Sequence, residues 1–124
     1  MAGAAQAEEV FVGIDVGGTK TALGLVAFPH GTILRRVELP TPQGAASGRD
    51  FLDDVARAAR RLIAEAPGCR GIGLGLCELV DRGGRVDSAH RVHWRGLPVR
   101  ETLSAIAPAV VEADVRAAAL AEIH

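Results

Sequence analysis

Apolar positions in the first part of the chain occur in short runs separated by turn residues. Residues 10–16, 21–28 and 32–39 each have the length and the aliphatic, β-branched content of a strand. The tripeptide "PHG" between the second and third runs is typical of a hairpin turn. Three strands with such short connections predict an antiparallel meander.

The apolar spacing changes to a helical period after the Pro- and Gly-rich stretch "PTPQGAASG". Apolar residues recur every three or four positions from Phe51 to Ile63, which predicts a helix with Asp50 as its N-cap. A fourth strand is expected in "RGIGLGLCELV", and a short helix is expected from Pro98 to Ile106. The chain then continues with a fifth strand in "AVVEAD" and a final helix in "VRAAALAEI". The predicted order of elements is therefore βββαβαβα.

The connections between these elements predict the strand order. Strands one, four and five are joined through helices, which favours parallel pairing by right-handed crossovers, whereas strands two and three fold back against strand one. We expect an α/β fold in one domain, with a disordered lead-in of residues 1–9 and a five-stranded mixed sheet of order 3-2-1-4-5 with flanking helices. Ligands of open α/β sheets bind outside the carboxyl ends of strands. The carboxylates at those ends of the parallel strands are Asp15, Glu78 and Asp114.

Composition and charge exclude several classes of function. Apolar residues make up 48% and charged residues 23%, and the formal net charge is -1, so bulk charge attracts neither nucleic acid nor anionic membranes. No apolar run approaches transmembrane length, and the first residues lack signal-peptide features, so we expect a cytoplasmic protein. Cys69 and Cys77 are not in CxxC spacing, and His90 and His93 have no third ligand nearby. Buried thiols and a pair of loop histidines are therefore expected rather than a metal site.

The stretch "DVGGTKT" interrupts the apolar pattern at the end of the first strand. It is not a Walker A loop, because Thr19 separates Gly18 from Lys20, and "GIGLGL" farther along does not fit the dinucleotide fingerprint. The pattern fits a hairpin turn in which Gly17 and Gly18 let the backbone approach an anion, beside the Thr19 hydroxyl and the Lys20 ammonium. Asp15 adds an oxygen ligand for Mg²⁺, directly or through water. The alternative is a turn without a ligand, in which adjacent glycines are common.

Four segments, in the correct order, resemble the ROK family of sugar kinases and repressors within the actin and hexokinase superfamily. "GIDVGGTKT" is similar to that family's first phosphate loop, and "GLGLCELVD" to its "GIGxPGLVD" strand. "WRGLPVRETL" resembles the segment before its second helix, and "VVEADVRAAALAE" resembles its "ENDANAAALAE". The resemblance spans Val10 to the end of the chain and implies a ribonuclease-H-like lobe of the actin and hexokinase type.

The resemblance also implies roles for the residues that match. The loop that faces the terminal phosphates of ATP and Mg²⁺ in such kinases is matched here by Asp15, Gly17, Gly18, Thr19 and Lys20. Asp114 stands where the family has its catalytic base, which takes the proton of the sugar hydroxyl as that hydroxyl attacks the γ-phosphate. As a residue in contact with the sugar, Asp114 is also a substrate-binding candidate. Capping the last helix is a further role for Asp114 and is compatible with both.

Three departures from the family pattern affect the sugar site. Ala113 replaces an asparagine that binds sugar hydroxyls in the family, and Arg116 replaces another asparagine. Cys77 and Glu78 replace a Pro-Gly pair. The Glu78 carboxylate would either accept sugar hydroxyls, which makes it a substrate-binding candidate, or repel phosphate.

The leading hypothesis is that residues 10–124 are the N-terminal lobe of an ATP-dependent sugar kinase that phosphorylates a hexose hydroxyl. The second lobe of such kinases has no counterpart in the sequence, so we expect the chain to be inactive alone. The expected protein partner is a separate second lobe or a second copy of the chain in a homo-oligomer. The alternatives are a non-catalytic sugar- or phosphate-binding or assembly module and, less favoured, a fragment of a sugar-responsive repressor.

Overall fold

The computed structural model describes residues 8–42, 48–76, 94 and 96–112 of the chain. Strands and helices follow the order β1 (Glu9–Val16), β2 (Lys20–Phe28), β3 (Thr32–Pro40), α1 (Gly48–Glu65), β4 (Ile72–Leu76), α2 (Val99–Ser104) and β5 (Ala109–Glu112). This order confirms the prediction as far as the fifth strand. The predicted final helix, residues 115–123, lies outside the described residues.

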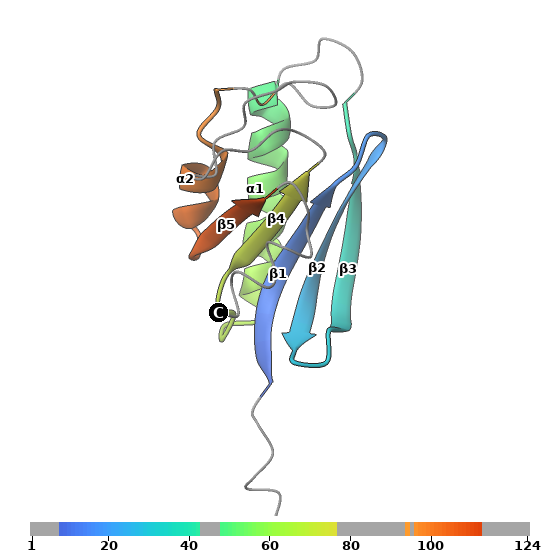
Figure 1. The fold of residues 1–124 in the computed structure, drawn as a ribbon, viewed down its shortest axis with the longest axis vertical. Coiled ribbons are helices and arrows are strands. Elements are labelled where there is room, and N and C mark those ends of the chain that lie inside the picture. Colours follow the sequence, from blue (N-terminus) through green and yellow to red (C-terminus); the bar gives the residue numbers. More distant parts are fainter. Residues whose placement is uncertain (1–7, 43–47, 77–93, 95, 113–124) are drawn as a thin grey trace, which may run out of the picture.

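The strands form one mixed sheet of order β3-β2-β1-β4-β5, as predicted (Figure 1). β1 pairs with β2, and β2 with β3, in antiparallel fashion, and the β2–β3 turn confirms the hairpin at "PHG". β1 and β5 both pair with β4 in parallel. The carboxyl ends of β1, β4 and β5 therefore lie along the same edge of the sheet.

Alternation along the strands places the apolar core on one face of the sheet. Val12, Ile14 and Val16 of β1 are buried there, and the apolar residues of β2 and β4 extend the same layer. α1 covers this face with residues spaced three or four apart: Phe51, Leu52, Val55, Ala59 and Leu62. Each large aliphatic side chain buried in this way contributes about 1.5–3 kcal/mol of transfer free energy. α1 lies behind the sheet in Figure 1, so the core lies between the helix and the sheet.

α1 begins earlier than predicted, and the N-cap prediction for Asp50 is wrong. The helix starts at Gly48, so Asp50 lies within its first turn. A carboxylate in the first turn favours a helix start through the helix dipole, which explains why the predicted first helical residue, Phe51, lies three positions after the observed one, Gly48. Trp94 packs at this end: its ring stacks on Phe51 at 5.5 Å between centroids, and its indole N–H donates to the Gly48 carbonyl at 2.8 Å.

Other element bounds differ slightly from the predictions. β1 begins at Glu9, which was assigned to the lead-in, and the Glu9 carboxylate pairs with Arg70 at 2.8 Å. α2 ends at Ser104 and has Pro98 as its N-cap; Val99 and Leu103 are buried, as expected. Predicted and observed strands otherwise agree to within one or two residues over the described part of the chain.

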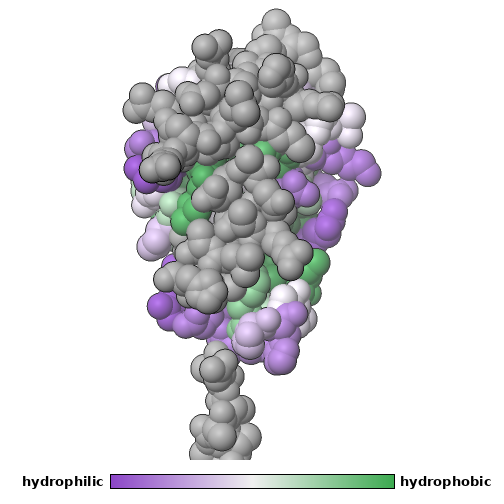
Figure 2. All heavy atoms as spheres, viewed as in Figure 1, coloured by the Kyte–Doolittle hydropathy of each residue, from purple (hydrophilic) through white to green (hydrophobic). Residues whose placement is uncertain are grey.

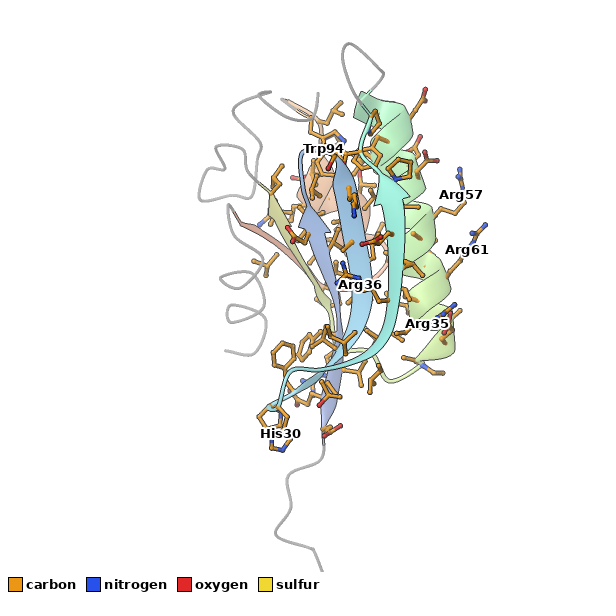
Figure 3. All side chains as sticks on the ribbon, turned by 90° about the vertical axis from the view of Figure 1, so that its right-hand side faces the viewer. His30, Arg35, Arg36, Arg57, Arg61 and Trp94 are labelled. Atoms are coloured by element: carbon orange, nitrogen blue, oxygen red, sulfur yellow. The ribbon has the colours of Figure 1, made fainter. Side chains whose placement is uncertain are left out.

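β3 is an edge strand that faces solvent along most of its length. Ile33 and Leu34 are exposed by 59% and 54%. The next two residues carry guanidinium groups on opposite sides of the strand: Arg35 pairs with Glu65 of α1 at 3.2 Å, and Arg36 pairs with Glu38 at 2.9 Å (Figure 3). Charged groups on an edge strand discourage pairing with another chain, so β3 is protected despite its two exposed apolar residues.

The face of the sheet away from α1 contains small residues at its centre. Gly24, Gly13 and Gly73 are register partners across β2, β1 and β4. Apolar residues are visible on this side as green patches bordered by hydrophilic ones (Figure 2). Small residues therefore lie along the middle of this face, and hydrophilic residues lie toward its margin.

Candidate phosphate-binding loop

The turn between β1 and β2 is short and tightly closed. The Gly17 N–H donates to the Lys20 carbonyl at 2.9 Å, and Val16 and Thr21 are the last register partners before the turn. A Cβ atom on residue 17 would lie 2.7 Å from the Lys20 carbonyl oxygen, a distance that no side chain tolerates. Gly17 is therefore required by a close backbone approach. This agrees with the interpretation of "GG" as a hairpin turn.

The segment that follows β3 reinforces this turn. The Thr41 N–H donates to the Thr19 carbonyl at 2.9 Å, and the Thr41 hydroxyl donates to the Gly17 carbonyl at 2.9 Å. The Thr41 hydroxyl is also 2.7 Å from the hydroxyl of Thr21. Sequence reasoning missed Thr41, because no motif marks a threonine whose partners lie twenty or more positions earlier in the chain.

Asp15 and Lys20 flank the turn and both are exposed. Asp15 is a register partner of Ala22 in β2 and of Gly75 in β4, so strand alternation places it on the face away from α1. Lys20 is the first residue of β2, not part of the turn itself. The structure thus brings the predicted carboxylate, the two glycines, the Thr19 hydroxyl and the ammonium together at one end of a hairpin.

A hollow of about 200 Å³ extends from Asp15 along the same face. Its lining includes the glycines of β1 and β2 and the side chains of Asp15, Val26, Ile33 and Arg36. A second hollow of about 350 Å³ lies between β3 and α1, where it is lined by Leu39, Phe51, Asp54, Arg57 and Arg61, among others. Arg57 and Arg61 project outward from α1 (Figure 3), and Arg57 pairs with Asp54 at 3.1 Å.

Lys20 is electrostatically coupled to a carboxylate of the edge strand. The hydrogen bond from Arg36 holds the pKa of Glu38 below its usual range, and the charge of Lys20 lowers it further. Glu38 is the register partner of Ala22 and lies on the same side of the sheet as Lys20. The neighbourhood of the turn therefore has both cationic and anionic groups, which suits a bound anion accompanied by a metal ion.

Glu78 and Asp114 follow the described ends of β4 and β5 and lie outside the described residues. The same holds for three residues that depart from the family pattern, Cys77, Ala113 and Arg116, and for the histidine pair. Cys69 is a free, half-buried thiol that approaches the Gly71 carbonyl at 3.5 Å.

Within the described ranges, no group of three or more His, Cys, Asp or Glu residues could hold a metal ion. Asp15 alone therefore fits Mg²⁺ only in the way that this ion is usually held in nucleotide sites, with one carboxylate, several waters and the phosphate oxygens of a ligand. In the same part of the chain, no helix is long and apolar enough to cross a membrane.

A family model described as "ROK family" matches residues 11–124. The chain belongs to the ROK family. The sequence is 33% identical to the glucokinase of Streptomyces coelicolor over 117 residues, which cover 90% of this chain and 34% of that protein. It is 35% identical to the N-acetyl-D-glucosamine kinase of Shigella flexneri over 102 residues, or 77% of this chain and 31% of that protein.

Solved structures of other ROK proteins share the fold. A ROK family glucokinase from Streptomyces griseus, in complex with glucose and AMPPNP, superposes with a TM-score of 0.69 at 30% identity over 83% of this chain and 32% of that one. The ROK hexokinase of Thermus thermophilus gives 0.66 at 34% identity, over 83% and 34%. The prediction of an actin- and hexokinase-type lobe is confirmed. The chain spans about a third of the length of these ROK relatives.

Proposed function

We propose that this chain is the phosphate-binding, N-terminal lobe of an ATP-dependent sugar kinase. The observation that carries the proposal is the closed turn at Gly17, placed at the carboxyl edge of the sheet with Asp15 and Lys20 on either side. Relatives that match the chain over this turn are sugar kinases, and one of them is known in complex with glucose and an ATP analogue. The substrate class that this supports is a hexose or a hexose derivative.

In this proposal the turn binds the terminal phosphates of ATP. The backbone of Gly17 and Gly18 approaches the phosphates closely, the Thr19 hydroxyl donates to an oxygen, and the Lys20 ammonium neutralises negative charge. Asp15 would hold Mg²⁺, directly or through water. When bound, the ion would neutralise the phosphate charge during transfer of the γ-phosphoryl group.

Asp114 is the proposed base and also contacts the sugar. Its carboxylate accepts the proton of the attacking hydroxyl, the hydroxyl oxygen forms a bond to the γ-phosphorus, and the β–γ bridging oxygen leaves with ADP. Glu78 is proposed to accept hydroxyls of the same sugar. Both residues follow strands that end on the same edge of the sheet as Asp15, because Gly75 of β4 is a register partner of both Asp15 and Glu112.

The proposal includes a requirement for further protein. These 124 residues correspond to about a third of a ROK kinase, and phosphoryl transfer in this superfamily closes two lobes around the substrates. We therefore propose that residues 10–124 do not catalyse phosphoryl transfer by themselves. A second lobe or a second copy of the chain would complete the site. A cytoplasmic location, where ATP is available, is part of the same proposal.

A non-catalytic sugar- or phosphate-binding module is the second candidate. The departures at Ala113 and Glu78 favour it, since they change two positions of the sugar site while the phosphate turn is kept. Sugar or phosphate binding without turnover, also in the presence of a second lobe, would support this candidate.

Calorimetric titration with MgATP tests the phosphate site. We expect the wild-type chain to bind MgATP. Lys20→Met should weaken this binding about tenfold or more, because it removes a charged hydrogen bond that contributes about 1.5–3 kcal/mol. Arg61→Met should leave the affinity unchanged. Arg61 is a matched control, an exposed cation on α1. Equal affinities of Lys20→Met and Arg61→Met for MgATP would contradict the proposed phosphate site.

An assay of ADP release with glucose and MgATP tests the requirement for a second lobe. No release above the spontaneous rate is expected from the chain alone. Release that Asp114→Asn abolishes would show that the chain is catalytic by itself.

A further inference from the structure

Thr21 and Thr41 are the only buried polar side chains among the residues that the structure describes, exposed by 0% and 3%. A hydroxyl removed from water is costly unless it is hydrogen-bonded, so each buried hydroxyl must have a partner within the protein. Both hydroxyls are adjacent to the turn between β1 and β2. Thr21 is the second residue of β2, and Thr41 directly follows Pro40, the last residue of β3.

The direction of the hydrogen bonds follows from the number of protons available. A carbonyl oxygen only accepts, so Thr41 donates its single hydroxyl proton to the Gly17 carbonyl at 2.9 Å. The contact of 2.7 Å between the two hydroxyls therefore has Thr21 as the donor and Thr41 as the acceptor. The result is a directed chain from Thr21 through Thr41 to Gly17.

Thr41 acts on the turn in two places. Its hydroxyl binds the Gly17 carbonyl, and its backbone N–H binds the Thr19 carbonyl at 2.9 Å. The Lys20 carbonyl accepts the Gly17 N–H. Two carbonyl oxygens of the turn, those of Gly17 and Thr19, and the adjacent carbonyl of Lys20 are thus directed to donors within the protein. A carbonyl oxygen turned toward a bound phosphate would repel it, whereas carbonyls held inward leave the approach to the anion less negative.

We propose that Thr41 is a positioning residue for the phosphate-binding turn: it holds the carbonyls of Gly17 and Thr19 away from the anion, so that the turn is preorganised before ATP binds. The inference rests on the proposed function and extends it to a residue outside the motif. Preorganisation raises affinity because the cost of ordering the turn is met during folding and not on binding.

The decisive comparison uses three variants of the full chain. Thr41→Val removes the hydroxyl at nearly constant shape, Thr41→Ser keeps it, and Thr21→Val removes the first donor of the chain without touching the turn. We expect Thr41→Val to weaken MgATP binding about five- to tenfold, Thr41→Ser to change it less than about twofold, and Thr21→Val to have a small effect even if it costs similar stability. Equal affinities of Thr41→Val and Thr21→Val would overturn the proposal.

A measurement without ligand separates this proposal from the proposed function. In the free chain, the amide hydrogen of Gly17 should exchange faster in Thr41→Val than in Thr41→Ser. The strand amides of the two variants should exchange at equal rates, which shows that overall stability is the same. Unchanged exchange at Gly17 overturns the positioning role even if ATP binds. If the wild-type chain binds neither MgATP nor inorganic tripolyphosphate, the proposed function fails, and the role of Thr41 in phosphate binding fails with it.

A further variant covers the case in which Thr41→Val does not fold. Thr41→Cys keeps the size of the side chain but offers only a weak donor. We then expect an affinity below that of Thr41→Ser, and equal affinities of the two would overturn the proposal.

Discussion

Asp15 of β1 and Gly75 of β4 are register partners in parallel strands, one residue before the end of each strand as described. This pairing places the carboxylate at the carboxyl edge of the sheet, next to the strand that leads to Glu78. The turn proposed to bind phosphate follows directly. The proposed metal and phosphate ligands therefore belong to one strand and its turn, whose positions depend on sheet pairing.

Substitution of Asp15 should affect the metal dependence of ATP binding. The proposed role of its carboxylate is to hold Mg²⁺ through water, so Asp15→Asn is expected to abolish most of the gain in affinity that Mg²⁺ gives. Binding of metal-free ATP should stay the same or improve, because a negative charge is removed. Titrations of both proteins with and without Mg²⁺ provide the test, and an unchanged Mg²⁺ effect in Asp15→Asn would exclude this role.

Gly17→Ala should destabilise the chain, whereas Gly13→Ala should be tolerated. A Cβ at residue 17 would lie 2.7 Å from the Lys20 carbonyl oxygen, while a Cβ at residue 13 meets only Val26 Cγ2 at 3.6 Å, an ordinary contact. Overpacking of this kind costs about 1–3 kcal/mol of unfolding free energy. Urea denaturation of the two variants measures the difference. Equal stabilities would mean that the turn relaxes freely.

Trp94 should report on the start of α1. It is the single tryptophan of the chain, it is fully buried, and its indole N–H donates to the Gly48 carbonyl. Trp94→Phe keeps the stacking on Phe51 but removes the hydrogen bond, so a loss of about 0.5–1.5 kcal/mol is expected. Trp94→Ala should cost about 3–5 kcal/mol because it also leaves a cavity. Thermal unfolding followed by circular dichroism distinguishes the two, and a similar small loss in both would contradict this packing.

The pH dependence near the turn should follow Glu38. Arg36, and more weakly Lys20, lower the pKa of this carboxyl in the folded chain. A folded-state pKa below the unfolded value gives stability that is present above the unfolded pKa and is lost as pH falls through the folded pKa. The effect on stability should be small because the pair is exposed.

Titration of Glu38 by NMR gives the most direct check of this coupling. Its pKa should rise in Arg36→Gln and rise less in Lys20→Met. A Glu38 that titrates identically in the wild type and in both variants would show that neither cation interacts with it.

The order of the strands in the sheet was predictable because it depends on the length and type of the connections between strands, which can be read from the sequence. Helices between strands one, four and five force parallel pairing, and the two short connections force antiparallel pairing, so the order follows without knowledge of side-chain contacts. The position of Asp15 at the carboxyl edge follows from its place in the same strand. The start of α1 was harder to predict, because Asp50 favours either an N-cap or a first-turn position.

Contacts between distant segments were not predictable in the same way. Thr41 reaches the phosphate turn only because the register of β3 against β2 pairs Lys20 with Pro40. Trp94 reaches Gly48 from a segment without periodicity. Thr41 belongs to no motif, and although Trp94 opens the segment "WRGLPVRETL", that motif does not indicate its contact with Gly48. Both contacts depend on burial, which a single sequence does not reveal.

The central claim is that the turn at Gly17 binds the terminal phosphates of ATP. Backbone amide NMR spectra of the full chain, recorded during addition of MgATP, test it most directly. The account predicts saturable shifts that are largest from Asp15 to Thr21 and at Thr41. Shifts confined to the hollow between β3 and α1, around Leu39, Arg57 and Arg61, or no shifts at millimolar MgATP, would contradict it.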